Sequence, residues 1–194
     1  MGKTVLHQNL YVYYFFYIKG NKSSFLLKIT MIMVYYKNKV KFKGRIILLI
    51  SLLITLFADQ LAKNIIQKVM LEGQSVVVFP FFYLTYTRNP GAAFGLFSYR
   101  TNILIAVTIL VIVIMTTIML TRPVAEKKRL IRIGMGLIIG GALSNLIDRL
   151  QLGLVIDYLD FRVWPVFNLA DTAIFIGACL LFKEIWYGES LRGR

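Results

Sequence analysis

The residues of this chain that could do chemistry are few, and most of them are aspartates. Five aspartates lie in or beside long apolar segments: Asp59, Asp148, Asp157, Asp160 and Asp171. A charged side chain in membrane hydrocarbon costs about 2.5–3.5 kcal/mol even on the lenient insertion scale. We therefore expect these carboxylates to have either a function or a partner.

Histidine and cysteine are almost absent, which narrows the possible chemistry. His7 and Cys179 are the single residues of their types, so we expect no Ser-His-Asp triad, no Cys-His pair and no metal site built from these residues. Two neighbouring carboxylates can hydrolyse a peptide bond without them. One ionised Asp accepts a proton from water, while the other, protonated, donates a hydrogen bond to the scissile carbonyl. Two carboxyls in a partly desolvated site share a proton near neutral pH, because their like charges raise one pKa.

Two segments place an amide and a carboxylate on one helix face. In GGALSNLIDRL, the residues Asn145, Asp148 and Arg149 have the spacing i, i+3, i+4. In FNLADTA, Asn168 and Asp171 have the spacing i, i+3. Two helices therefore each present an amide and a carboxylate, and the spacing leaves open whether the two faces meet.

Four apolar segments are long enough to carry these residues across a membrane. They run from about 46 to 66, 101 to 120, 131 to 150 and 165 to 187. The second has no charge over the roughly 20 residues that a helix needs to cross a bilayer. The chain is 58% hydrophobic, more than the roughly half that is usual in soluble domains. These features predict an all-α integral membrane protein with four transmembrane helices and no large water-soluble domain.

The basic residues indicate an orientation. The net charge of +14 could suggest a nucleic-acid partner, but the lysines and arginines flank apolar segments, so we expect no nucleic-acid partner. By the positive-inside rule, both ends of the four-span core are cytoplasmic and the segments 67–100 and 151–164 face outside. All five aspartates then lie toward the outer face. The run SVVVFPFFYLTYT is rich in β-branched and aromatic residues, which predicts a small extracytoplasmic β-sheet.

The chain divides into three predicted regions. Residues 41–190 form the four-span membrane domain, and residues 191–194 form a short cytoplasmic tail. Residues 1–40 are apolar but broken by lysines. They are either an upstream extension, with Met31 or Met33 as the actual start, or an interfacial helix.

Five motifs occur in the order and the four-span frame of a known family. They are DQLAK (Asp59–Lys63), RNPGAAFG (Arg88–Gly95), GGALSNLIDR (Gly140–Arg149), VIDYLDF (Val155–Phe161) and FNLADTAI (Phe167–Ile174). Together they resemble the lipoprotein signal peptidases, also called signal peptidase II, over roughly residues 42–187. Residues 1–40 have no counterpart in this resemblance.

The resemblance implies a membrane-embedded aspartic endopeptidase of the bacterial plasma membrane. Its partners would be prolipoproteins, cleaved before a diacylglyceryl-modified cysteine, and membrane lipids. We expect a monomer, and no metal or organic cofactor is implied. Asp157 and Asp171 would be the catalytic dyad that activates water. The residues implied to bind substrate or to support the site are Asp59, Lys63, Asn89, Gly91, Ala92, Asn145, Asp148, Arg149, Asn168 and Ala170.

Simpler interpretations of several residues stay open. Asp59 and Lys63, at i, i+4, could form a stabilising ion pair, and Asp148 could form one with Arg149. Ser144 could suggest a serine nucleophile, but its base would have to be Lys63 on another span, so we do not expect a Ser-Lys enzyme.

Two other functions also stay open. A small proton- or ion-coupled transporter would use intramembrane aspartates, but it should show internal repeats or helices broken at the midplane, which we do not find in the sequence. A non-catalytic assembly subunit would need no dyad.

Gly136 and Gly140 form a small-xxx-small pattern, which predicts close helix packing.

Overall fold

The computed structural model describes residues 24–91, 100–121 and 129–190. The chain divides into two units, Met1–Phe42 and Lys43–Arg194, and the predicted site lies in the second. In chain order, the described helices and strands are α2 (Ser24–Val69), β1 (Ser75–Phe79), β2 (Phe82–Asn89), α3 (Thr101–Thr121), α5 (Arg129–Leu152), β3 (Val155–Asp160) and α6 (Leu169–Ser190).

Three described helices are long and apolar enough to cross a membrane: Arg45–Val69 within α2, Thr101–Met119 within α3, and Arg129–Leu152, which is α5. They agree with the first three predicted spans to within a few residues. The predicted fourth span differs, because α6 begins at Leu169 rather than near residue 165 and carries four charged residues, Asp171, Lys183, Glu184 and Glu189. The structure is therefore mostly helical, with three candidate spans and a small sheet.

Helices α3 and α5 differ in how much of their surface is packed. The apolar side chains of Val107, Leu110 and Val113 in α3 are more than half exposed, which suits a helix with lipid as its solvent. Helix α5 instead contacts neighbours on several faces, and glycines allow the approach. A methyl group added at Gly140 would lie 2.6 Å from the carbonyl oxygen of Leu52 in α2. The close packing predicted for this glycine pattern is thus confirmed.

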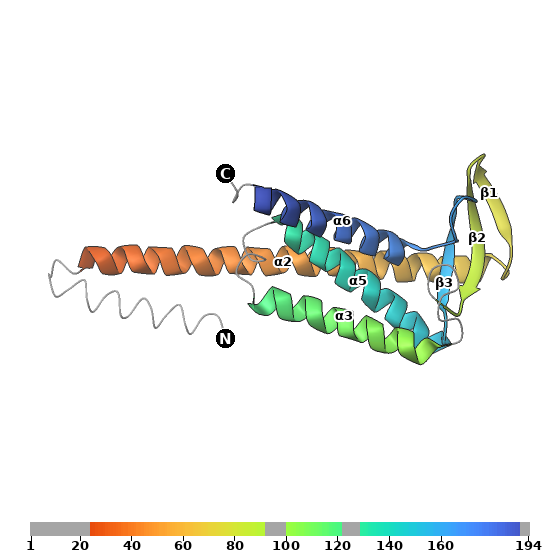
Figure 1. The fold of residues 1–194 in the computed structure, drawn as a ribbon, viewed down its shortest axis with the longest axis horizontal. Coiled ribbons are helices and arrows are strands. Elements are labelled where there is room, and N and C mark those ends of the chain that lie inside the picture. Colours follow the sequence, from red (N-terminus) through yellow and green to blue (C-terminus); the bar gives the residue numbers. More distant parts are fainter. Residues whose placement is uncertain (1–23, 92–99, 122–128, 191–194) are drawn as a thin grey trace. The chain divides into compact units, whose positions relative to one another are not determined.

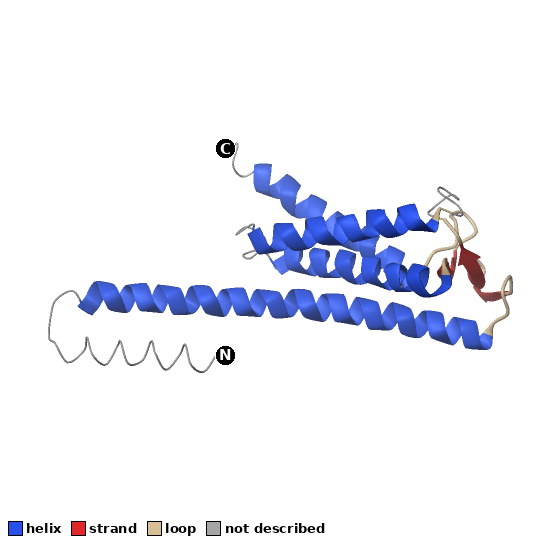
Figure 2. Ribbon diagram, turned by 90° about the horizontal axis from the view of Figure 1, so that it is seen from below, coloured by secondary structure: helices blue, strands red, loops and turns tan. Residues whose placement is uncertain are grey.

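The predicted sheet is present, and it includes a strand that we did not predict. Strands β1 and β2 form an antiparallel hairpin, and β3 pairs antiparallel with the other edge of β2. Strand β3 comes from the segment predicted only as a connection between the third and fourth spans. Its register places Asp157 opposite Thr87. The sheet lies at the end of the helices where α2 ends and α6 begins (Figure 1), and Figure 2 shows the same placement from a second direction.

An apolar cluster joins the end of α2 to the sheet. Its buried members are Ile66, Met70, Tyr86, Ile156 and Tyr158. Successive side chains of a strand point to opposite faces. Burial of Ile156 and Tyr158 in this cluster therefore directs Asp157, which lies between them, to the opposite face of β3.

Candidate active site

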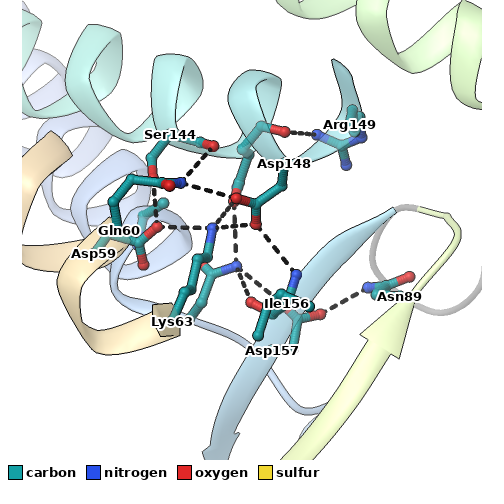
Figure 3. Close-up of polar contacts among 12 residues, drawn as sticks. Asp59, Gln60, Lys63, Asn89, Ser144, Asp148, Arg149, Ile156 and Asp157 are labelled. Atoms are coloured by element: carbon teal, nitrogen blue, oxygen red, sulfur yellow. Dashed lines mark hydrogen bonds and ion pairs between the residues drawn. The ribbon is translucent and has the colours of Figure 1, made fainter. Parts of the chain in front are cut away.

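Asp157 lies in β3 and is only 2% exposed. Its carboxylate accepts hydrogen bonds on both oxygens from side-chain amides, from Asn89 Nδ2 at 2.8 Å and from Asn168 Nδ2 at 2.7 Å. Figure 3 shows the Asn89 contact, which joins β2 to β3. Because both donors are uncharged, they orient the carboxylate without supplying the positive charge of an ion pair.

The surroundings of Asp157 change its acidity. Burial raises the pKa of the Asp157 carboxyl to about 7, and the nearby Asp171 carboxylate contributes in the same direction. The amides of Asn89 and Asn168 and the charge of Lys63 act to lower this pKa, but they are outweighed. A carboxyl with a pKa near 7 is about half protonated at neutral pH, so it can either donate or accept a proton.

Asp171 lies in the first turn of α6, and Asn168 organises that turn. Asn168 Oδ1 accepts the backbone N–H of Asp171 at 2.8 Å, and its carbonyl accepts the N–H of Thr172 at 3.2 Å, so Asn168 is the N-cap of the helix. The Asp171 carboxylate accepts a hydrogen bond from Asn145 Nδ2 of α5 at 2.8 Å. The Asn168 amide also bonds Asn145 Oδ1 and Asp157. The two polar helix faces that the spacing predicted therefore meet.

Lys63 lies at the centre of a second buried cluster and is 1% exposed. Its ammonium contacts Asp59 Oδ2 at 2.7 Å and Asp148 Oδ2 at 2.8 Å (Figure 3). It also donates to Asn145 Oδ1 at 2.9 Å, so the three contacts match its three N–H donors. The predicted Asp59–Lys63 ion pair is confirmed. The predicted pairing of Asp148 with Arg149 is wrong, because consecutive helix residues point in directions about 100° apart and Asp148 faces Lys63.

Arg149 instead contacts the chain that follows β2. Its guanidinium donates to the carbonyl of Gly91 at 3.3 Å and to that of Asn145, one turn earlier, at 3.5 Å. The backbone N–H of Gly91 donates to Asn89 Oδ1 at 2.9 Å. Gly91 is thus held through both its N–H and its carbonyl. Ala92, also predicted for this loop, lies outside the described residues.

Asp59 and Asp148, the two buried carboxylates that contact Lys63, each also accept a hydrogen bond from a backbone N–H group. Asp59 Oδ1 accepts the N–H of Ala170 at 2.9 Å, and Asp148 Oδ2 accepts the N–H of Ile156 at 3.2 Å. Ala170 therefore contributes a backbone group, and its side chain is fully buried.

Gln60 and Ser144 belong to the cluster, although sequence reasoning did not assign them to it. Gln60 Nε2 donates to Ser144 Oγ at 2.9 Å and to Asp148 Oδ1 at 2.8 Å, and Ser144 Oγ donates to Asp59 Oδ2 at 2.6 Å. Two signals were available: Gln60 adjoins Asp59 in DQLAK, and Ser144 lies one helical turn before Asp148. Since its hydroxyl donates to Asp59, Ser144 is engaged in the network rather than aligned with a lysine base.

Every predicted site residue that the structure describes contacts another member of this network. Across the described ranges, no three or more His, Cys, Asp or Glu side chains are grouped so as to hold a metal ion. The arrangement offers two carboxyls oriented by amides, Asp157 buried and Asp171 partly buried, and the Asp157 carboxyl has a pKa near neutrality. Two such carboxyls can act as general base and general acid, accepting a proton from water and donating one to a polar substrate bond.

Comparison with known proteins agrees with these features. The lipoprotein signal peptidase of Pelotomaculum thermopropionicum is 49% identical over 136 residues, which cover 69% of this chain and 88% of the relative. That of Moorella thermoacetica is 44% identical over 148 residues, which cover 76% of this chain and 97% of the relative. A solved bacterial membrane enzyme has a TM-score of 0.70 and 29% identity, and the match covers 74% of this chain and 89% of that one.

A family model described as signal peptidase (SPase) II matches residues 49–187. The matched range contains both predicted catalytic aspartates and every residue of the network around them. On this evidence the chain belongs to the signal peptidase II family.

Proposed function

We propose that this protein is an aspartic endopeptidase that removes signal peptides from prolipoproteins, with Asp157 and Asp171 as its catalytic dyad. The observation that carries the proposal is the position of Asn168, whose side chain bonds the carboxylate of Asp157 and the backbone N–H of Asp171. Family membership supports the reaction, since the relatives described above are lipoprotein signal peptidases. The comparisons give no support to the transporter alternative.

The proposed reaction uses one proton shared by the two carboxyls. The ionised carboxylate accepts a proton from water as the water oxygen attacks the scissile carbonyl carbon. The protonated carboxyl donates a hydrogen bond to the carbonyl oxygen, and a proton then passes to the leaving amine as the C–N bond breaks. The amides of Asn89, Asn145 and Asn168 hold the carboxyls in advance, so little ordering remains for the reaction step.

The proposed substrate is a prolipoprotein cut before a diacylglyceryl-modified cysteine. The signal helix enters from the lipid, and its acyl chains remain in the outer leaflet, which sets the depth of the scissile bond. Gly91 favours this interpretation, since a residue without a side chain lets a substrate backbone approach closely. Asn89 connects this loop to Asp157.

The proposed topology has four spans within residues 41–190 of a monomer. In this topology α6 is the fourth span, and its exposed Phe175 and Phe182 suit contact with lipid. The basic segment between α3 and α5 and both core ends are cytoplasmic. The sheet and the dyad lie toward the outer face of the plasma membrane.

The test is cleavage of a diacylglyceryl-modified prolipoprotein by the purified full-length chain in detergent. We expect Asp157→Asn and Asp171→Asn to remain folded and to lose activity by about 10³-fold or more, as removal of a central catalytic group does in other proteases. Asp160→Asn is the matched control, because Asp160 is a buried carboxylate of the same strand that bonds Thr85 and Arg162 instead.

Mass spectrometry of the products identifies the cut, which we expect directly before the modified cysteine. The same prolipoprotein without its diacylglyceryl group tests whether the lipid is required. Cleavage at the wild-type rate by both dyad variants would refute the aspartic mechanism.

A further inference from the structure

Two buried carboxylates outside the dyad each bind the residue directly before a dyad aspartate. Asp59 accepts the backbone N–H of Ala170, which precedes Asp171. Asp148 accepts the backbone N–H of Ile156, which precedes Asp157. The two carboxylates have the same counter-ion, because Lys63 contacts Asp59 at 2.7 Å and Asp148 at 2.8 Å.

We propose that Asp59, Lys63 and Asp148 form a positioning unit, the carboxylate clamp, that sets the distance between the two catalytic carboxyls. The inference rests on the proposed function, since it assumes that Asp157 and Asp171 act together. None of the three clamp residues need touch the substrate. They act through the backbone of β3 and of α6.

The placement of the clamp explains why it can set a distance. The dyad residues lie on different elements, Asp157 on β3 and Asp171 on α6. Asp59 and Lys63 lie one turn apart on α2, and Asp148 lies on α5, so the clamp joins two helices to the two backbones that carry the dyad. Lys63 also donates to Asn145 Oδ1, which leaves Asn145 Nδ2 to donate to Asp171. The clamp therefore also orients the amide that bonds Asp171.

The burial of the clamp makes its members interdependent. Asp59, Lys63 and Asp148 are at most 4% exposed. A buried charge that loses its counter-ion is strongly unfavourable, so the remaining members must rearrange when one is removed. Removing a clamp residue should therefore move the backbones that it holds.

A purely structural role makes a different prediction. The Asp59 carboxylate at the start of α6 favours that helix by binding a free N–H group. If this were its only role, clamp substitutions would lower the amount of folded protein and leave the kcat of each folded molecule unchanged. A positioning role requires kcat to fall in protein that is still folded, with KM little changed.

The experiment compares Asp148→Ala with Asp148→Asn and with Asp160→Ala. Asparagine keeps an acceptor oxygen for the Ile156 N–H but not the charge, whereas alanine removes both. Asp160→Ala is matched because it also deletes a buried carboxylate of this region that accepts a backbone N–H, from Arg162 at 2.8 Å. Arg162 does not adjoin either dyad residue.

We expect Asp148→Ala to lower kcat about 100-fold, the effect that a misplacement of about 1 Å can have on a catalytic group, with KM within about threefold of wild type. Asp148→Asn should lose less, about tenfold, and Asp160→Ala should keep kcat within about threefold. Thermal unfolding of each variant in detergent gives the folded fraction to which kcat is normalised.

A double substitution tests whether the clamp acts as a unit. The combined loss in Asp59→Asn/Asp148→Asn should be smaller than the product of the two single losses, because the first substitution already breaks the shared ion pairs. Multiplicative losses, an unchanged kcat in folded Asp148→Ala, or an equal loss in Asp160→Ala would each overturn the clamp.

If the dyad variants are inactive while Asp148→Ala is fully active, the clamp fails and the proposed function stands. If the dyad variants cleave, the proposed function itself fails.

Discussion

Strand β3 (Val155–Asp160) holds two buried aspartates in different surroundings. Asp157 lies toward the start of the strand, here called its inner end, and Asp160 is its last residue, at the outer end. Asp157 and Asp160 are both at most 4% exposed. Asp157 is held by two neutral amides and lies near a second carboxylate. Asp160 accepts the Thr85 hydroxyl at 2.7 Å and the backbone N–H of Arg162 at 2.8 Å, and it forms an ion pair with the Arg162 side chain at 3.4 Å.

The difference shows that burial alone does not prepare a carboxylate for catalysis. A residue spacing of three places Asp157 and Asp160 on opposite faces of the strand. Asp157 accepts the amides of Asn89 in β2 and of Asn168 at the start of α6, and it lies near the Asp171 carboxylate. Asp160 instead contacts Thr85 of β2 and Arg162. At the inner end, uncharged amides orient the Asp157 carboxyl and a second carboxylate lies nearby. Together with burial, this keeps Asp157 partly protonated near pH 7.

Among substitutions that remove a partner of these two aspartates, the largest effect is expected at the inner end of β3. Asn168→Ala removes the amide that bonds Asp157 and the oxygen that caps α6. We expect kcat to fall about 100-fold through misplacement, and the free energy of unfolding to fall by about 1–2 kcal/mol through loss of the cap. Steady-state cleavage and thermal unfolding in detergent measure the two effects.

Thr85→Ala is the matched control at the outer end, because it removes a hydrogen bond to Asp160. It should leave kcat within about twofold, since the contact lies away from the dyad, and reduce stability by about 1 kcal/mol. Equal losses of kcat in both variants would contradict the distinction between the two ends.

The pH dependence of the wild-type enzyme is the next largest effect. Because burial and Asp171 raise the pKa of Asp157 to about 7, the folded enzyme keeps this proton to a pH about three units above that of an ordinary aspartate. The shared-proton state is therefore lost as the pH rises through about 7. We expect kcat/KM to decline above that pH, approaching a tenfold loss per pH unit.

The raised pKa of Asp157 also affects the stability of the folded protein. Between about pH 4 and 7 the folded chain binds this proton and the unfolded chain does not, so the contribution of Asp157 to stability decreases as the pH rises. Asp157→Asn should flatten that part of the pH–stability curve, and Asp160→Asn should leave the kcat/KM profile as it is. A wild-type decline in kcat/KM that begins near pH 4 would contradict the raised pKa.

The smallest effect is expected at Arg162, at the outer end. Its side chain is half-exposed and contacts Asp160, the Ser75 hydroxyl and the face of Tyr83. Such exposed contacts are worth about 1 kcal/mol or less, so Arg162→Ala should lower the free energy of unfolding by no more than about 1 kcal/mol and leave kcat unchanged.

Arg162→Gly tests the backbone at the same position. Arg162 has a φ of 65°, which disfavours residues with a Cβ atom by roughly 1–2 kcal/mol. Glycine should therefore be less destabilising than alanine when the thermal unfolding midpoints are compared. A lower midpoint for Arg162→Gly than for Arg162→Ala would argue against this.

Parts of the site could be predicted from sequence because they depend on helical spacing. The i, i+3 pairs Asn145–Asp148 and Asn168–Asp171 placed amides and carboxylates together on their helices, and the i, i+4 spacing of Asp59 and Lys63 indicated their ion pair. The spacing could not show that these faces meet, because that depends on how α2, α5 and α6 pack.

Other features could not be read from local patterns. Strand β3 is buried on both faces, so it lacks the alternation that reveals a half-buried strand. The fourth span was predicted to begin near residue 165. Phe167 instead pairs with Leu159 of β3 and Asn168 caps the helix, so α6 begins at Leu169. A structural pair of Asp148 with Arg149 was one interpretation of the sequence, whereas the counter-ion of Asp148 is 85 positions earlier in the chain, at Lys63.

The shared counter-ion has a consequence for biogenesis. Asp59 and Lys63 belong to one helix and can neutralise each other as soon as α2 enters the bilayer. Asp148 has no such companion until α5 docks against α2, and until then hydrocarbon penalises its charge. The contact of Lys63 with Asp148 therefore favours the docking of α5 against α2 while the chain assembles.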